Sequence, residues 1–243
     1  MEINGKYFIR NHRNILFISV TLFITFAFMR FIAMLGPRYV QPLLPISFLL
    51  MIAATFLLLN KHDQKIIGLQ PTRFIYYFYG ILSGFAGALI CYLTSVYWLP
   101  TQEDSWFVSI QNFYVSNPAY VEGDTAANFL IFTIPAILFS PFGEEIFFRG
   151  FFHQSLRTNF SETTTTLVDC LGFGIVHLAH HGIIYSNGQI VYNPNSAWLF
   201  VALMFLTALL FVQLRRFANS IYPAIAAHMA FNLTMNWVIF YVM

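Results

Sequence analysis

The stretch IFTIPAILFSPFGEEIFFRGFF, residues 131–152, decides what kind of molecule this chain is. It is apolar enough to cross the core of a bilayer, which takes ~20 such residues. It nevertheless contains two adjacent carboxylates, Glu144 and Glu145, and Arg149 follows Glu145 by four residues, about one helical turn. Charged groups at bilayer depth are costly and usually serve a function. We therefore expect these three residues to mark a functional site.

The composition of the whole chain is that of a membrane protein. Of its 243 residues, 58% are hydrophobic and only 9% are charged, and the mean hydropathy is +0.66. An ordinary soluble domain has about 25% charged residues. We therefore predict an all-α, polytopic bundle of transmembrane helices. The net charge of +2 does not favour nucleic acid as a partner, and Cys91 and Cys170 both lie in apolar segments, which argues against a disulfide framework.

The apolar segments predict about seven membrane-spanning helices in a single transmembrane domain, residues 1–243. The predicted spans are residues 15–35, 42–59, 74–99, 127–148, 166–181, 197–214 and 221–242. Pro135 and Pro141 interrupt the fourth span, and we predict a kink or break within residues 140–144. In a straight helix, Glu144 would lie ~5–10 Å from the depth of the histidines in the fifth span.

The distribution of basic residues predicts the orientation, because Lys and Arg are retained on the cytoplasmic side. All but two of the 12 Lys and Arg residues lie in alternate loops, and the exceptions are Arg30 and Arg38. The residues in those loops are Lys6, Arg10, Arg13, Lys61, Lys65, Arg73, Arg149, Arg157, Arg215 and Arg216. The loop of residues 100–125 has no basic residue, and acidic Glu103 and Asp104 lie in it. We predict a cytoplasmic N-terminus and assign no chemistry to Arg30.

Two further spans contain polar residues at helical spacing. Those of the fifth span are Asp169, Phe173, His177 and His181, and those of the seventh are His228, Asn232 and Asn236. Residues four apart share one face of a helix, so both stripes are expected to line a polar pocket with Glu144. A buried carboxylate can act as general base on water, and histidine and amide groups can donate to an oxyanion. Ser140 and Cys170 are less well placed as nucleophiles.

Three of these patterns resemble the motifs of the CAAX-protease and bacteriocin-processing (CPBP) intramembrane endopeptidases. EEIFFRG, residues 144–150, resembles the first motif, Phe173-x-x-x-His177 the second, and His228-x-x-x-Asn232 the third. They occur in the family's order and on separate predicted spans. The resemblance covers about residues 127–240, which we predict to form the catalytic core. Residues 1–126 hold the first three spans and an extracytoplasmic loop, without a matching motif.

The resemblance implies hydrolysis of peptide bonds in peptides or in lipidated and other membrane proteins. By its motifs, Glu144 and His177 would activate water, and His228 and Asn232 would form the oxyanion hole. Glu145, Arg149 and Phe173 would support them. The family includes CAAX prenyl endopeptidases, lysostaphin-resistance-type proteins and bacterial proteins of bacteriocin processing and immunity. We expect an integral, multi-pass protein of a bacterial plasma membrane.

Members of this family are often labelled metalloproteases, so zinc is an alternative to metal-free hydrolysis. A zinc ion would take Glu144, His177 and His228 as its ligands, since catalytic zinc uses three such side chains and a water. However, the zincin pattern H-E-x-x-H is absent, and Asn232 of the third motif would be a poor zinc ligand. The sequence therefore favours no cofactor.

Structural roles and other functions also stay open. Glu144 could form a structural pair with Arg149, His177 could be a hydrogen-bonded core histidine, and polar residues of the seventh span could join helices. A non-catalytic scaffold or immunity protein of the same fold is one alternative function. A proton-coupled transporter is another, although no internal repeat is visible. The sequence assigns no role to Asp169, His180 or His181.

Overall fold

A computed structural model describes residues 3, 5, 12–99, 101, 104–186 and 189–243. Lys6, Arg10 and Glu103, which entered the prediction of orientation, lie outside these residues. The described chain is almost entirely helical, which confirms the all-α fold class. One pair of short antiparallel strands is added to it, in the segment 182–196 that was predicted as a loop.

The described elements follow one another as a series of long helices joined by short ones. The first half comprises α1 (His12–Leu35), η2 (Arg38–Val40), α2 (Leu43–Leu58), α3 (Lys61–Ile66), α4 (Phe74–Trp98) and α5 (Trp106–Ser116). The second half comprises α6 (Thr125–Leu138), α7 (Ser140–Glu144), η4 (Glu145–Phe152), α8 (His153–Arg157), α9 (Glu162–Val176), η5 (His177–Ala179), β1 (Ile183–Ser186), β2 (Gln189–Tyr192), α10 (Pro194–Ala218) and α11 (Tyr222–Tyr241).

Five helical stretches are long and apolar enough to cross a membrane. They are Asn14–Leu35, Arg38–Leu58, Phe74–Trp98, Thr125–Arg157 and Ser196–Ala218. With 20 residues α11 is also long enough, but its polar His and Asn residues lower its mean hydropathy. The 15 residues of α9 extend only about 22 Å, less than a bilayer core of about 30 Å. The number of seven spans and the cytoplasmic N-terminus therefore stay predictions.

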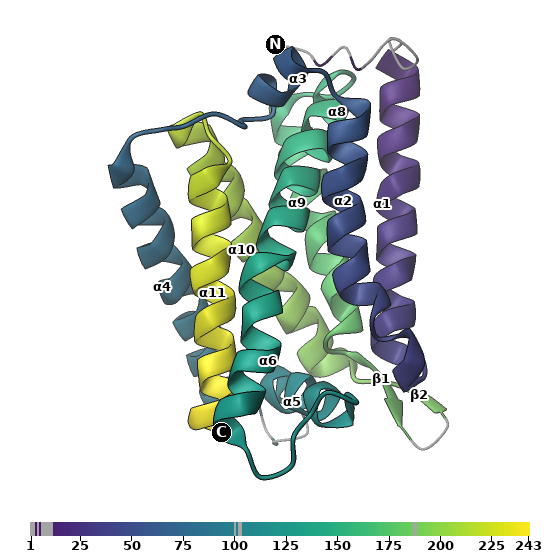
Figure 1. Ribbon diagram of the computed structural model, residues 1–243, viewed down its shortest axis with the longest axis vertical. Helices are drawn as coiled ribbons and strands as arrows, with labels where there is room; N and C mark the ends of the chain where they lie inside the picture. Colours follow the sequence, from purple (N-terminus) through teal and green to yellow (C-terminus); the bar gives the residue numbers. More distant parts are fainter. Residues whose placement is uncertain (1–2, 4, 6–11, 100, 102–103, 187–188) are drawn as a thin grey trace.

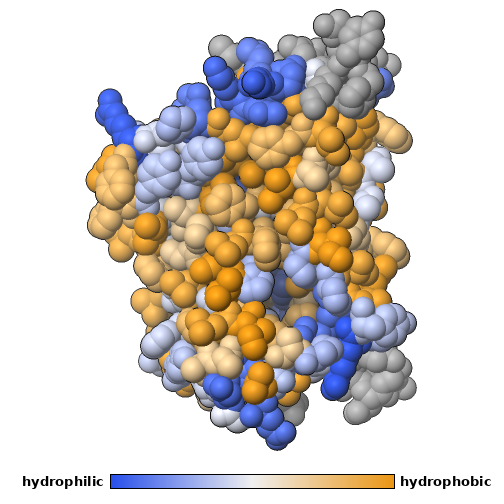
Figure 2. All heavy atoms as spheres, viewed as in Figure 1, coloured by the Kyte–Doolittle hydropathy of each residue, from blue (hydrophilic) through white to orange (hydrophobic). Residues whose placement is uncertain are grey.

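The outer surface of the bundle fits a membrane environment. Figure 2 shows a broad apolar band between two ends at which hydrophilic residues gather. In Figure 1 the start of α1, α3 and α8 lie at one of these ends, and the C-terminus, α5 and the strands lie at the other. Large apolar side chains such as Phe28, Phe85 and Trp98 are exposed. Lipid can cover this apolar surface without the free-energy cost that contact with water would have.

Helix α4 is attached to the bundle mainly through α11. Glycines allow the two backbones to approach closely: a Cβ on Gly84 would lie 2.0 Å from the carbonyl oxygen of Ala227, and one on Gly80 would lie 2.4 Å from that of Pro223. Small residues four apart are a common basis of helix packing in membranes. This contact fixes the position of α11, which carries His228 and Asn232.

The fourth predicted span is irregular on both sides of the segment in which a break was predicted. Phe139 separates α6 from α7, and from Glu145 onward the chain winds as a π-helix, η4. The prediction of an irregular helix is confirmed. Its predicted position was wrong, because residues 140–144 are helical and the irregularities lie just outside them, at Phe139 and from Glu145 onward. Pro141 supplies no N–H to the preceding turn, which weakens the helix there. π-helices are rare and occur frequently at functional sites.

An aromatic core holds the π-helix in place. All eight residues of η4 are buried. The ring of Phe147 lies edge-on to Phe26 of α1 with centroids 5.0 Å apart, and that of Phe148 lies edge-on to Phe173 of α9 at 5.4 Å. Edge-to-face pairs of this kind add to the energy of burial. The core therefore fixes the start of η4, where Glu144 and Glu145 lie.

Two regions that were predicted as loops contain structure. Helix α5 lies across the end of the bundle near the C-terminus (Figure 1), and Trp106 at its start stacks on Phe200 of α10 at 5.4 Å. Strands β1 and β2 pair in antiparallel fashion, with Ile183 opposite Tyr192. The fifth predicted span also ends early, since α9 stops at Val176 and a 3₁₀ turn follows.

Candidate active site

A cavity of about 460 Å³ lies inside the bundle. Its walls come from α1, α2, α5, α6, α7, α10, α11 and the end of α9, and most of its lining side chains are apolar. Figure 2 shows this face of the molecule hollowed between α2 and α6, within the apolar band. Glu144, His177, His228 and Asn232 all line the cavity. It can therefore hold a substrate beside all four predicted catalytic residues.

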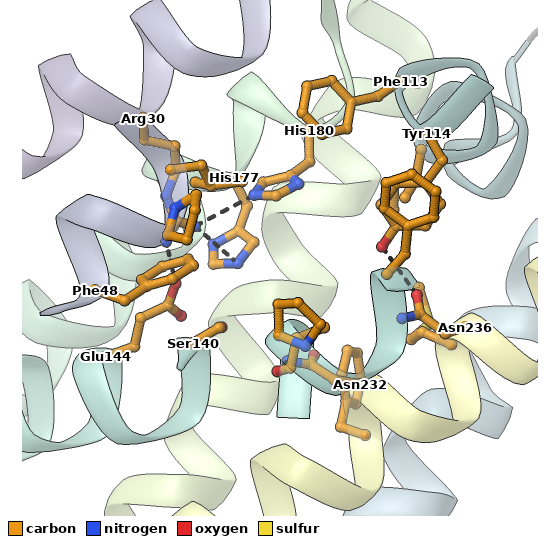
Figure 3. A pocket seen from close by; sticks show the side chains of 18 of the residues that line it. Arg30, Phe48, Phe113, Tyr114, Ser140, Glu144, His177, His180, Asn232 and Asn236 are labelled. Atoms are coloured by element: carbon orange, nitrogen blue, oxygen red, sulfur yellow. Dashed lines mark hydrogen bonds and ion pairs between the residues drawn. The ribbon is translucent and has the colours of Figure 1, made fainter. Parts of the chain in front are cut away.

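Arg30 of α1 forms the main polar contact in this cavity. Its Nη2 donates a hydrogen bond to Oε1 of Glu144, and its Nη1 lies 3.4 Å from Nε2 of both His177 and His180 (Figure 3). Only 2% of Arg30 is exposed. The sequence assigned no chemistry to this residue, and the structure shows that it is the charge partner of Glu144. The available signal was charge balance, because Arg149 can pair closely with only one of the two glutamates.

Glu144 and His177 lie close together, but the Arg30 guanidinium lies between them. Nδ1 of His177 lies 2.6 Å from the carbonyl oxygen of Phe173. A carbonyl oxygen only accepts, so Nδ1 carries the proton and Nε2 presents a lone pair to Arg30. His177 therefore contacts the charge partner of Glu144.

The predicted stripe of the fifth span ends at His177. His181 is fully buried away from the cavity, with its ring nitrogens 2.8 Å from the hydroxyl of Ser109 and 2.7 Å from that of Ser196. The expectation that it faces the pocket was wrong, because the helix stops at Val176 and the following turn redirects the chain. His180 lines the cavity in its place.

Glu145 forms a second carboxylate–guanidinium pair, outside the cavity. Its Oε2 lies 3.3 Å from Nε of Arg149, and both side chains are fully buried. The Arg149 guanidinium lies 4.1 Å from the ring centroid of Phe173, within cation–π range. Neither Glu145 nor Arg149 lines the cavity. This pair is thus enclosed by protein.

His228 of α11 connects the two glutamates. Its Nδ1 lies 2.9 Å from Oε1 of Glu145, and its Nε2 lies 3.8 Å from Oε2 of Glu144. Because Glu145 is paired with Arg149, it is an ionised acceptor, and Nδ1 of His228 carries the proton. In the neutral ring, Nε2 then carries a lone pair that faces the cavity.

The polar stripe of the seventh predicted span lines the cavity along its length. Nδ2 of Asn232 donates to the carbonyl oxygen of Ala136 at 2.9 Å, which leaves one N–H of the amide for a ligand. Further along, Asn236 accepts from the hydroxyl of Tyr114 at 2.9 Å. Figure 3 shows Arg30, Glu144 and His177 at one end of the cavity and Tyr114 with Asn236 at the other.

Residues 126–234 match the family model of the type II CAAX prenyl endopeptidase Rce1-like proteins. This segment, somewhat less than half of the chain, is similar to the CAAX protease family. The segment contains all three motifs and Glu144, His177, His228 and Asn232, whereas Arg30 lies outside it. No match to the chain is found among curated proteins or among solved structures. That family is one of membrane proteases.

Among the described residues, the contacts of Glu144, His177 and His228 do not favour a zinc ion bound by these three side chains. In the part of the chain that the structure describes, no group of three or more His, Cys, Asp and Glu side chains is arranged to hold a metal ion. Of the proposed ligands, Glu144 and His177 both contact the Arg30 guanidinium, whose positive charge opposes a second cation beside them. A zinc ion needs convergent ligands. We therefore derive no catalytic step through a metal.

A further group of charged residues surrounds His153, the first residue of α8. Asp169 binds Nδ1 of His153 at 3.0 Å, and Nε2 of His153 lies 3.4 Å from Glu162. Asp169 thus orients a histidine that the sequence interpretation had not considered. Burial alone would raise the pKa of Glu162, but nearby His153, Arg216 and Arg157 lower it below its ordinary value.

Proposed function

We propose that this protein is an intramembrane endopeptidase that hydrolyses peptide bonds of membrane-associated proteins or peptides. The observation that carries the proposal is the position of Glu144. It is a buried carboxylate, 1% exposed, which lines a cavity large enough for a peptide segment, and its Oε2 faces Nε2 of His228. The similarity of residues 126–234 to a family of endopeptidases supports the same reaction.

Glu144 is the proposed general base. Its Oε2 is buried without a hydrogen-bond partner among the described residues. In the proposed reaction, a water that enters beside it donates one hydrogen bond to Oε2 and another to Nε2 of His228, 3.8 Å from that oxygen. When the water oxygen attacks the peptide carbonyl carbon, Glu144 accepts the proton. It returns this proton to the leaving nitrogen as the C–N bond breaks. General base catalysis of this kind typically contributes 10²–10⁴-fold, roughly.

We propose parts for the two histidines that differ from those that the resemblance implies. His228 presents a lone pair beside Glu144 and is proposed to orient the water. His177 accepts from Arg30 and is proposed to position that side chain. The remaining N–H of Asn232 is free to donate to the oxyanion, as the third motif implies.

The proposed substrates are peptides or lipidated and other membrane proteins that enter through the hollow between α2 and α6. We further propose a multi-pass protein of a bacterial plasma membrane with a cytoplasmic N-terminus. The reaction is proposed to need no cofactor, because a carboxylate and a histidine are sufficient to activate water.

The test compares membranes that contain the wild-type protein, Glu144→Gln or Ser140→Ala. New peptide termini are identified by mass spectrometry. An endopeptidase is expected to produce fragments that disappear with Glu144→Gln and persist with Ser140→Ala, which controls for a serine nucleophile at the same end of the cavity. Identical termini in all three samples would contradict the proposal and favour a scaffold. Proton flux into liposomes without cleavage would favour a transporter.

A further inference from the structure

We propose that Arg30 of α1 is a further catalytic residue, whose guanidinium stabilises the oxyanion formed during peptide hydrolysis. The inference rests on the proposed endopeptidase function and deepens it. Arg30 lies about a hundred residues before the first motif and outside the segment that matches the family model. Its part in the site follows from its contacts alone.

The guanidinium has the right position for this part. Each carboxylate oxygen of Glu144 has one neighbour across the cavity: Oε1 accepts from Arg30, and Oε2 faces His228. Both oxygens belong to one carboxylate, so a carbonyl attacked by a water at Oε2 would lie beside the guanidinium that contacts Oε1. Among the described lining residues, Arg30 is the only Lys or Arg, so no other such cation can reach an oxyanion there.

Charge accounting gives the physical reason. Before reaction, the negative charge of Glu144 is balanced by Arg30. As the water oxygen bonds to the carbonyl carbon, its proton moves to Glu144, and the carbonyl π electrons become the negative charge of the oxyanion. Arg30 then exchanges a carboxylate partner for an oxyanion partner. The net charge of the cavity stays constant, which matters where the local dielectric constant is low.

The other contacts of Arg30 permit this exchange. Its Nη1 lies against the imidazole nitrogens of His177 and His180, at 3.4 Å each, and its guanidinium carbon lies 5.5 Å from the ring centroid of Phe48. Because His177 contacts it through a lone pair, this ring orients the guanidinium without neutralising it. Among these contacts only Glu144 carries the opposite charge.

The test uses the full-length protein in proteoliposomes with a pool of membrane-anchored peptides of mixed sequence. Cleavage is measured by mass spectrometry of new N-termini for the wild type, Arg30→Ala, Glu144→Gln and the control Arg73→Ala. Arg73 is exposed and lies just before α4, away from the cavity. Arg30→Ala is expected to lower the rate by about 10²-fold, and added methylguanidinium is expected to restore part of it. Arg73→Ala is expected to cleave at the wild-type rate.

The outcomes separate this inference from the function on which it rests. Cleavage that is lost in Glu144→Gln but stays within about threefold of wild type in Arg30→Ala overturns the inference alone. A folded Arg30→Ala protein that is inactive and gains nothing from methylguanidinium also overturns it. Absence of wild-type cleavage, or cleavage by Glu144→Gln, overturns the endopeptidase and the inference together. If the Arg30→Ala variant does not fold, the test compares Arg30→Lys with Arg30→Gln. The lysine variant keeps the positive charge and is expected to cleave faster than the glutamine variant. Equal cleavage rates of these two variants overturn the inference.

Discussion

The two carboxylate–guanidinium pairs of this protein begin at adjacent residues and differ in almost every other respect. Glu145 pairs with Arg149 one turn further along the same chain segment, and protein encloses both. Glu144 pairs with Arg30 of a distant helix, at the wall of a cavity. Both carboxylates are at most 1% exposed, so burial does not distinguish them. The two glutamates differ in their access to the cavity. Only Glu144 lines it, so only Glu144 can contact a substrate.

The sharpest test of this difference compares Glu144→Gln with Glu145→Gln. We expect Glu144→Gln to lower the cleavage rate by about 10³-fold or more, because it removes the base, while the protein still folds. The fraction of folded protein, measured by size-exclusion chromatography, serves as the control. Equal losses of rate in both folded variants would remove the distinction between the two pairs.

The enclosed pair is expected to reveal itself in stability. Glu145→Gln leaves the charge of Arg149 buried without its partner, which should lower the free energy of unfolding by about 3–5 kcal/mol. The double variant Glu145→Gln/Arg149→Met removes both charges and should recover most of that loss. Thermal unfolding in mild detergent measures both. A double variant no more stable than the single one would show that the pair has no structural role.

His228 contacts both glutamates, so its variants should separate its contribution to cleavage from its contribution to stability. In His228→Asn the amide can still donate to Glu145, but nothing replaces Nε2 beside Glu144. We expect a loss of cleavage of about 10²-fold with nearly unchanged unfolding. His228→Phe should in addition lose about 1–3 kcal/mol, because Oε1 of Glu145 loses its donor. The idea fails if His228→Asn cleaves at the wild-type rate.

The partly exposed cluster at Glu162 provides a surface counterpart to the buried pairs. Its side chain is 37% exposed, and Arg157 lies 2.8 Å away. Because the pKa of Glu162 is lowered in the folded protein from its ordinary 4.5, its stabilisation is present above that value and is lost as the pH falls through the lowered pKa. Glu162→Gln should cost less than about 1 kcal/mol at pH 7. Unfolding at pH 7 and in acid should show the wild type and the variant converging in acid, and a persistent gap would contradict this.

Metal removal is expected to have the smallest effect. The cavity offers a carboxylate already paired with Arg30, and no described group of three ligands converges on a metal site. Treatment with 1,10-phenanthroline followed by desalting should therefore leave the cleavage rate within about twofold. A loss that zinc alone restores would overturn the metal-free proposal.

Much of the fold could be predicted from the sequence, because hydropathy and proline act locally. Apolar length located the first four helical spans, and Pro141 indicated the irregular helix around it. The end of the fifth span could not be found in this way, because the four-residue spacing of Phe173, His177 and His181 continues past Val176, where the helix stops. Helix α5 and the two strands depend on packing against the bundle, and the segments themselves show no clear period.

The site was predictable as a set of residues but not as a set of contacts. Motif spacing led to Glu144, His177, His228 and Asn232, and all four line one cavity. The partner of each imidazole nitrogen is decided by tertiary packing, which spacing does not report. Arg30 was missed for the same reason, since its partners lie more than a hundred residues further along the chain.

Because α4 packs closely on α11, the position of His228 in the cavity depends on a contact that α11 makes outside the cavity. Gly84 contacts the backbone of Ala227, the residue directly before His228, at a separation that admits no methyl group. A side chain added there would push on the helix from outside and shift the imidazole that faces Glu144. The alignment of His228 with the base thus depends on a residue that has no side chain and never meets the substrate.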